Sequence, residues 1–474
     1  MKKIIFLAII LELLLFGLCF LPSANVFDYY AQYLRALSLK GKEAEKAVKL
    51  SLTINPFYPH SRMLLTSILL QKSNEKPELF LEALKQLKIT FKIGARRGKI
   101  SWNTLKTFLA MWPFLEEEDR KIAEQAGKIA IKRMNRREID ELFLLWSTYC
   151  RDYEFIKSIL RERPLLFLRL ANYIKENHLP LKWRWEALSN YENYIVQYLQ
   201  SKRVENMGKR ELLGSLRMLR SIKFYNELVG EKFDYTNYNN LMEQITGALA
   251  HKHPSPQTIM DFANSTSSTE KIKELLNTLT QQGFFNKRDL QTFYLREYLL
   301  YKAKDYDTLK QEINIFRKQT GWINKKETDY FIKINLLLVD VYYEENMLLT
   351  ASSIVEELHK NFPDSPEILL RIKRIREMMG EAFDLESPNF LYGEEVEIPV
   401  KRRIKKFYFS PLVGQKTLTL KPEVFINNER GNKILTIFFN GKVAYEGYLD
   451  ELPEKIKISL RDGLDFYTVE IRIW

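Results

Sequence analysis

The sequence predicts a multi-domain, mainly α-helical chain in which a superhelix of helical repeats, an α-solenoid, is followed by a small antiparallel β-sandwich. The first observation is composition: the 474 residues include 18 Gly and 16 Pro, both below the average usage of roughly 7% and 5%. The second is periodicity, because apolar residues recur every three or four positions up to residue 385 and every second position in the segments after it. A chain of this length has room for several domains.

The overall composition excludes several classes of protein. A hydrophobic content of 46% with 13% aromatic residues excludes a disordered chain, and a mean hydropathy of -0.29 excludes a protein with many membrane spans. The net charge of +13 favours an anionic partner. Most of this charge is expected on the solvated surface.

The first element along the chain is an export segment at residues 1–24. Lys2 and Lys3 precede an apolar run at residues 4–21 that only Glu12 interrupts. This is the charged and apolar pattern of a signal peptide, but the run is also just long enough to span a bilayer. Pro22 makes a poor cleavage site, which favours an uncleaved membrane anchor, whereas Glu12 would cost about 2.5 kcal/mol or more at mid-depth. Both interpretations place the remaining chain outside the cytoplasm, in the periplasm or at the cell surface.

The two cysteines give a second indication of the compartment. Cys19 lies in the export segment, and Leu18 before it argues against a lipidation site. Cys150 therefore has no partner for an intramolecular disulfide, and we expect it to be a small core residue beside Trp146 and Tyr149. These features are typical of a bacterial envelope protein.

The second element, at residues 25–385, reads as helix after helix, and one segment within it carries a detailed pattern. In "LLLVDVYYEENMLLTASSIVEELHKNFPDSP" a large residue and an aromatic are followed by a small residue, two further apolar residues and a proline. These six residues are Leu338, Tyr342, Ala351, Val355, Leu358 and Pro363. The order resembles the tetratricopeptide repeat, a pair of antiparallel helices that cross at a small residue. Asn346 stands at the usual turn glycine and tolerates the same left-handed conformation.

Weaker copies of this pattern occur elsewhere in the helical region. In "YLLYKAKDYDTLKQEINIF" the turn at residues 304–307 is similar, with Leu309 at the crossing position, and "EAEKAVKLSLTINPFYP" repeats the second-helix spacing. The resemblance covers a minority of the chain, and a repeat cannot bury its apolar face alone. We therefore expect the intervening helices to complete one superhelix, the alternative being an irregular all-α domain.

The third and fourth elements are a linker at residues 386–396 and a β-sandwich at residues 397–474. Two alternating runs, 434–439 and 442–449, flank Asn440-Gly441, the dipeptide that a type I′ hairpin turn requires. Further strands are predicted at 407–409, 418–425, 456–460 and 467–473. The hairpin and the final strand resemble the last strands of immunoglobulin-like or jelly-roll accessory domains. We expect the helical region and the sandwich each to fold alone.

A search for chemistry finds no catalytic, cofactor or metal site. "GARRGKI" lacks the spacing of a phosphate-binding loop, and His251 and His253 have no acid or cysteine nearby to complete a metal shell. The acidic run at residues 116–119 is typical of the first turn of a helix.

The favoured function is therefore a non-enzymatic envelope scaffold that binds a protein partner through its helical-repeat surface, in secretion or surface-polysaccharide assembly. The alternative is carbohydrate binding, including anionic polysaccharide, by the sandwich, with sugar rings stacked on Tyr445, Tyr448 and Trp474. A hydrolase is a more remote third reading. Export excludes nucleic acid as a partner.

Overall fold

The structure is a computed structural model that describes residues 28–94, 97–285, 289–319, 328–381, 390–391, 394–400, 405–411, 415–424, 433–460 and 467–474. The chain divides into two compact units, Met1–Leu170 and Ala171–Trp474, and each is described by itself. The candidate anchor at residues 4–21 lies outside the described residues. Within the described ranges, no helix combines the length and apolarity needed to cross a membrane.

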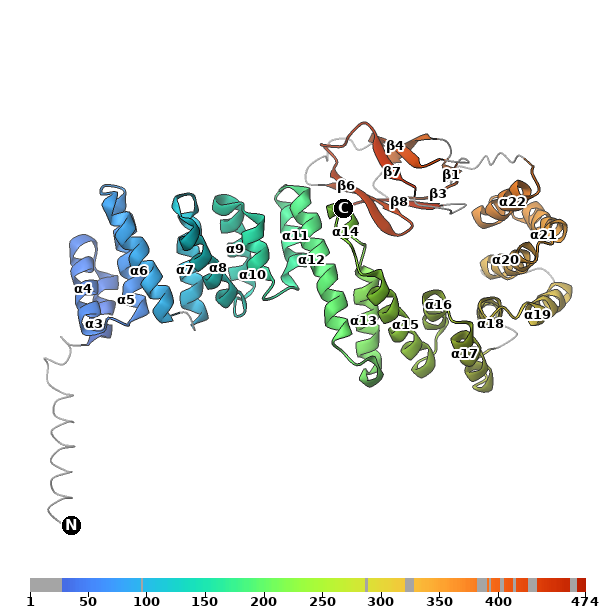
Figure 1. Cartoon of the computed structure of the whole chain (residues 1–474), viewed down its shortest axis with the longest axis horizontal. Helices are drawn as coiled ribbons and strands as arrows, with labels where there is room; N and C mark the ends of the chain where they lie inside the picture. The colour runs from blue at the N-terminus through green and yellow to red at the C-terminus, as the bar shows by residue number, and fades with distance from the viewer. Residues whose placement is uncertain are drawn as a thin grey trace, which may run out of the picture. The chain divides into compact units, whose positions relative to one another are not determined.

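The first unit is a series of helices that pack mainly on near neighbours in the sequence (Figure 1). Local signals explain individual boundaries. The Asn135 side chain accepts a hydrogen bond from the backbone N–H of Glu138, and the Glu138 carboxylate accepts one from the backbone N–H of Asn135, which is a capping box. The elements are α3 (Tyr29–Ser38), α4 (Gly41–Ile54), α5 (Pro59–Ser73), α6 (Glu78–Gly94), α7 (Gly98–Ala110), η1 (Trp112–Phe114), α8 (Glu117–Ile131), α9 (Arg136–Leu145), the π-helix η2 (Trp146–Cys150), α10 (Tyr153–Leu160) and α11 (Leu166–Glu176), which crosses the boundary between the units.

The second unit continues with helices and ends in β-structure. Its helices are α12 (Leu181–Gln200), η3 (Val204–Asn206), α13 (Lys209–Ser221), α14 (Asn226–Val229), α15 (Tyr235–Lys252), α16 (Pro256–Ser265), α17 (Thr269–Gln281), α18 (Leu290–Lys302), α19 (Tyr306–Gln319), α20 (Thr328–Glu344), α21 (Leu348–Asn361) and α22 (Pro366–Met378). Helices α16, α18, α20 and α22 form a row in which each contacts the next. We call this the first-helix row, because α18 and α20 each begin a helical hairpin.

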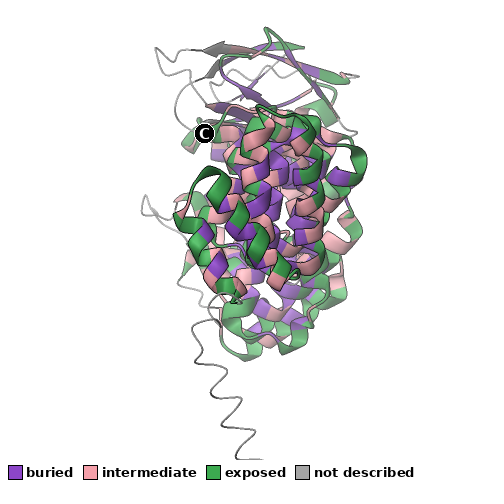
Figure 2. Ribbon diagram, turned by 90° about the vertical axis from the view of Figure 1, so that its left-hand side faces the viewer, coloured by how far each residue is buried: buried purple, intermediate pink, exposed green. Residues whose placement is uncertain are grey.

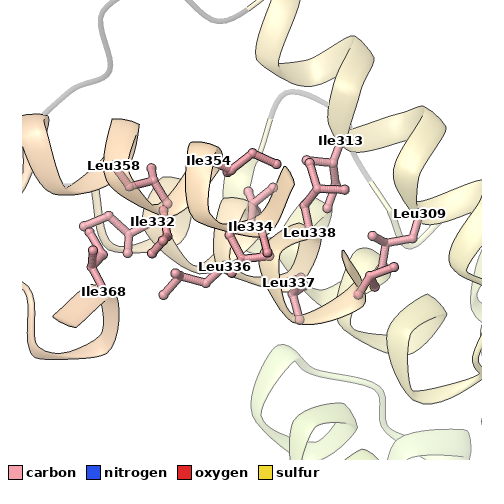
Figure 3. Packing of buried hydrophobic residues seen from close by; sticks show 14 of the residues in the cluster. Leu309, Ile313, Ile332, Ile334, Leu336, Leu337, Leu338, Ile354, Leu358 and Ile368 are labelled. Carbon is pink, nitrogen blue, oxygen red and sulfur yellow. The ribbon is translucent and has the colours of Figure 1, made fainter. Parts of the chain in front are cut away.

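The predicted repeat unit is the hairpin of α20 and α21. Leu338 on α20 and Ala351 on α21 are fully buried, and Val355 and Leu358 are buried beside them. The ring of Tyr342 is half-buried against the same cluster, and Pro363 follows the end of α21. Figure 3 shows the core that this hairpin shares with α19 and α22, through Leu309 and Ile313 on one side and Ile368 on the other.

The two hairpins α18–α19 and α20–α21 turn in the same way. Asn346 has φ of 59° and Lys304 has φ of 58°, so both lie in the left-handed region. In each turn the next amide donates back into the first helix, from Met347 to the Tyr342 carbonyl (2.8 Å) and from Asp305 to the Leu300 carbonyl (3.0 Å). This is the hydrogen bond of a Schellman motif. Successive hairpins therefore share one turn geometry although neither uses glycine.

The β-structure, which we call the β-module, has two sheets. A five-stranded sheet has the order β1-β3-β8-β5-β6 and a three-stranded sheet the order β2-β4-β7. The strands are β1 (Phe390–Leu391), β2 (Glu395–Val400), β3 (Lys405–Phe409), β4 (Thr417–Val424), β5 (Ile434–Phe439), β6 (Lys442–Tyr448), β7 (Ile456–Ser459) and β8 (Tyr467–Ile473). The predicted order, helical repeats followed by β-structure, is confirmed.

The β-module differs from a fully antiparallel sandwich at two pairs. β1 runs parallel to β3, and β2 runs parallel to β4. The chain alternates between the two sheets from β1 to β4, so these pairs are joined by crossovers and not by tight turns, which would require antiparallel strands. β1 lies in the segment predicted as a linker, most of which is outside the described residues.

The hairpin β5–β6 has the predicted turn, with φ of 50° at Asn440 and 80° at Gly441. Inward side chains of both sheets form one core that includes Ile398, Phe409, Leu420 and Ile437. Figure 2 colours stretches of both the helices and the strands as buried.

Candidate partner-binding face

The three aromatic residues predicted to stack on sugars occupy different environments. Tyr448 is only 2% exposed. Its ring stacks on His178 (4.0 Å between centroids), and its hydroxyl donates to the Leu179 carbonyl (2.9 Å). Tyr448 is thus enclosed between the β-module and the helices and cannot take a sugar ring, a burial that strand alternation alone could not reveal.

The other two aromatics are more accessible. Tyr445 is half-buried against the sandwich core. Trp474 is 49% exposed, its indole N–H donates to the Thr436 hydroxyl (3.0 Å), and the Arg472 guanidinium lies over its ring at 5.5 Å. The structure therefore does not gather the three residues on one open surface.

The residues considered for chemistry do not form a reactive cluster. Across the described ranges, no three His, Cys, Asp or Glu side chains gather as a metal site would require. Cys150 ends η2 and is half-buried, and burial raises the pKa of its thiol to about 12, which keeps it protonated and unreactive. The acidic run lies in the first turn of α8, where Asp119 pairs with Lys88 (2.5 Å).

A different surface stands out on the first-helix row. Half-buried tyrosine rings pack on the hydrophobic core there, with cationic side chains on or beside them. We call this surface the tyrosine face and define it by residues of α18 (Tyr294, Tyr298, Tyr301 and Lys302), α20 (Tyr330, Lys333, Asp340, Tyr343 and Glu344) and α22 (Arg371 and Arg374).

The rings of this face are held in place by one another. Tyr294 lies 6.0 Å from Tyr298 on its own helix and 5.9 Å from Tyr330 on the next, measured between centroids. Burial raises the pKa of both Tyr294 and Tyr298 to about 12. Their hydroxyls therefore stay protonated at neutral pH, and that of Tyr298 donates to the side-chain oxygen of Asn264 at 2.5 Å.

The two carboxylates of the tyrosine face are already bound. Arg371 donates to both oxygens of Asp340, at 3.1 and 2.9 Å. Tyr301 donates to one oxygen of Glu344 at 2.5 Å, and Tyr306 of α19 donates to the other. These bonds tie α18, α20 and α22 together and use the acceptors that the face would otherwise present.

Several donors of the same face remain available. The ammonium of Lys302 lies over Tyr298 at 5.6 Å, and that of Lys333 lies over Tyr330 at 5.8 Å. Among the residues that the structure describes, neither lysine pairs with a carboxylate. The Arg374 guanidinium lies over Tyr343 at 4.1 Å, but it has other partners and is not counted among the available donors. Two acids, Glu367 at the start of α22 and Asp340, contribute to raising the pKa of Tyr294. The face is rich in donors and poor in free acceptors.

Our sequence predictions did not identify the tyrosine face, although a signal was present. Tyr294, Tyr298 and Tyr301 are spaced by four and three residues, which puts them on one side of a helix. The sequence did not indicate that this side of α18 lies beside the side of α20 that carries Tyr330 and Lys333.

Comparisons with known proteins add little to this description. No protein-family model matches the chain, and no curated protein matches it. A match to the crystal structure of the P58(IPK) TPR domain has a TM-score of 0.20 and 10% identity and covers 75% of this chain and 89% of that one. A match to the structure of Naa15/Naa10 bound to HypK-THB has a TM-score of 0.22 and 14% identity and covers 76% of this chain and 62% of that one. Likenesses this loose support no inference, so the helical-repeat assignment rests on the helix pairs themselves.

Proposed function

We propose that this protein is a non-enzymatic scaffold that binds a protein partner through the tyrosine face, and that the bound part of the partner is an acidic segment. The observation that carries the proposal is the imbalance on this face between available donors and free acceptors. Lys302 and Lys333 present ammonium groups, whereas Asp340 and Glu344 already accept hydrogen bonds. A partner rich in carboxylates supplies the missing acceptors.

The tyrosine rings supply contact area for the same partner. Tyrosine is enriched among the residues that dominate binding energy at protein interfaces, because a rigid ring buries much apolar surface and keeps one polar end. On this face the rings are fixed by the core beneath them. The partner would therefore bind a surface that needs little reordering, which lowers the entropic cost of association.

The direct test uses three labelled octapeptides, (Glu-Ser)4, (Gln-Ser)4 and (Lys-Ser)4, titrated into the full chain by fluorescence anisotropy. We expect the glutamate peptide to bind and the other two not to bind, with affinity falling as salt is added. A double variant, Lys302→Ala with Lys333→Ala, should weaken binding about tenfold or more, since hydrogen bonds between charged groups contribute roughly 1.5 to 3 kcal/mol each.

The matched control replaces two exposed lysines away from this face, Lys209→Ala with Lys360→Ala. It should leave the affinity unchanged. Equal weakening by the control, or equal binding of the glutamine peptide, would contradict a specific acidic site.

The location of this scaffold remains part of the proposal. The charged and apolar pattern of residues 1–24 supports export and attachment to the bacterial envelope, and hence a role in secretion or surface-polysaccharide assembly. A reporter that is active only outside the cytoplasm, fused after Trp474, should be active. Activity of a cytoplasmic reporter instead would overturn export and restore nucleic acid as a partner.

One observation favours a second candidate, carbohydrate binding by the β-module. The Trp474 indole is exposed and carries the Arg472 guanidinium over its ring, a combination that suits an anionic sugar polymer. Trp474→Ala should then abolish retardation of the protein in gels that contain such a polymer, while Tyr445→Ala has a smaller effect. Retardation unchanged by Trp474→Ala would exclude this site.

A further inference from the structure

The β-module is fastened to the helices by a buried polar cluster. The carboxylate of Glu446 on β6 is 2% exposed and accepts hydrogen bonds from three groups. These are the guanidinium of Arg184 on α12 (2.8 Å), the hydroxyl of Tyr225 (2.9 Å) and the hydroxyl of Thr436 on β5 (3.1 Å). We call this contact, with the loop at residues 222–225, the junction.

A second set of bonds joins the β-module to the same loop. The amide of Val443 on β6 donates to the carbonyl of Lys223 at 3.1 Å. Lys442 beside it pairs with Glu227 of α14 at 3.2 Å. The loop between α13 and α14 therefore supports β6 in addition to α12, and α14 lies next to β6 (Figure 1).

The opposite side of this loop is held by one carboxylate. Glu192 of α12 accepts hydrogen bonds from the amides of Lys223 (2.6 Å) and Tyr225 (2.9 Å). Phe224 between them has φ of 63°, a left-handed conformation that is strained for a residue with a bulky side chain. Glu192 thus holds a strained loop in the shape that β6 requires.

The β-module also contacts the far end of the helical series. Leu369 and Leu370 of α22 form a small apolar cluster with Phe390 of β1, and Lys373 bonds to Ser410. The helices from α12 to α22 are therefore fastened to the β-module at both ends, so release of the junction would open this closed arrangement.

We propose that Glu192 makes the junction a pH-sensitive clasp, which holds the β-module more tightly when the carboxyl group is protonated and more loosely when it is ionised. Glu192 is 3% exposed, and within the described residues no lysine or arginine pairs with it. Burial disfavours the charged form of a carboxyl group when no cation pairs with it. Opening of the loop returns the group to water, where its charge is stabilised.

The direction of the pH dependence follows from the two states. Burial raises the pKa of Glu192 to about 7 in the closed junction, more than the hydrogen bonds from the loop lower it. In the opened loop the pKa is that of an ordinary glutamate, about 4.3. The opened state therefore binds fewer protons between these values, so opening becomes more favourable as pH rises from about 4.5 to 7 and then levels off.

Other charged and titratable groups surround the junction. Burial raises the pKa of Tyr225 and Tyr238 above 10, so neither titrates in this range. His178 lies 3.8 Å from Asp450 and 3.6 Å from Glu451. The groups that face Glu192 or its loop are Lys223, Tyr225, Tyr238, Arg184, Glu446, Arg220, Glu470 and Arg472.

The test is hydrogen exchange of the Val443 amide in the full chain, corrected for the intrinsic pH dependence of exchange. We expect its protection to fall roughly 50-fold between pH 5 and pH 7.5. Glu192→Gln keeps the shape and an acceptor oxygen, and it should remove most of this change. The Val469 amide, in the middle of the five-stranded sheet, serves as the control and should not follow the same curve.

A second measurement covers the case in which the variant does not fold. The side-chain carboxyl carbon of Glu192 can be followed by NMR in the unmodified protein, and it should titrate near pH 7. Titration near 4.3, protection of Val443 that does not vary with pH, or an unchanged curve in Glu192→Gln would each overturn the clasp.

Discussion

The junction and the tyrosine face are both polar surfaces of the second unit, but they use their polar groups in opposite ways. At the junction, donors from α12, the 222–225 loop and β5 converge on the Glu446 carboxylate, and the whole cluster is buried. On the tyrosine face the acids are occupied, while Lys302 and Lys333 lie over half-buried tyrosine rings.

This difference indicates where a binding function should be sought among the residues that the structure describes. A closed cluster contributes to stability, because removing one member leaves a buried charge without a partner. An open set of donors contributes little to stability and is available to a ligand. The same residue types, tyrosine with arginine and a carboxylate, therefore indicate architecture in one place and binding in the other.

The largest expected effect tests the closed cluster. Glu446→Ala should lower the free energy of unfolding by about 3 to 5 kcal/mol, because the Arg184 guanidinium is left buried without a counter-charge. Urea denaturation of the full chain measures this change. The control, Glu395→Ala, removes an exposed carboxylate that pairs with Lys421 and Lys455, and it should change the free energy of unfolding little. Similar losses in the two variants would show that the junction stabilises the fold no more than an exposed ion pair does.

The second largest expected effect is the pH dependence of stability that Glu192 causes in the junction. Because folding raises the pKa of Glu192 to about 7, its contribution to stability is complete below about pH 4.3 and is lost as pH rises towards 7. Relative to Glu192→Gln, the natural chain should lose on the order of 3 kcal/mol of unfolding free energy between pH 4.5 and 7.5. Parallel stability curves for the two proteins would contradict this assignment.

A smaller effect tests the scaffold beneath the tyrosine face. Ala351 is fully buried where α21 packs on α20, so Ala351→Leu should overpack the core and cost roughly 1 to 3 kcal/mol. Leu349→Ala on the same helix, at a position 76% exposed, should stay within about 0.5 kcal/mol. A melting temperature that Ala351→Leu leaves unchanged would show that the two helices do not cross closely there.

The sequence predicted those features that depend on neighbouring residues. The order of residues around Ala351, the left-handed turn at Asn346 and the Asn440-Gly441 hairpin are all local patterns, and the structure has the corresponding helices and turns. The contact of Glu446 with Arg184 spans 262 positions, and no local pattern encodes such a pairing. For the same reason the sequence does not predict that the helices cover Tyr448.

The smallest expected effect on stability belongs to the tyrosine face itself. The double variant Lys302→Ala with Lys333→Ala should unfold within about 0.5 kcal/mol of the natural chain, because neither ammonium group pairs with a carboxylate among the described residues. Circular dichroism during urea denaturation measures this. A loss as large as that of Glu446→Ala would mean that these lysines are part of the architecture and would break the contrast between the two surfaces.

The most direct test of the central claim is site-specific photo-crosslinking. Tyr330→p-benzoylphenylalanine places the crosslinker on the tyrosine face, and Tyr235→p-benzoylphenylalanine places it beside Lys442 at the edge of the junction. With the labelled (Glu-Ser)4 peptide, we predict crosslinking from position 330 that excess unlabelled peptide abolishes, and none from position 235. Equal crosslinking at the two positions, or crosslinking from position 235 alone, would contradict the assignment of binding to the tyrosine face.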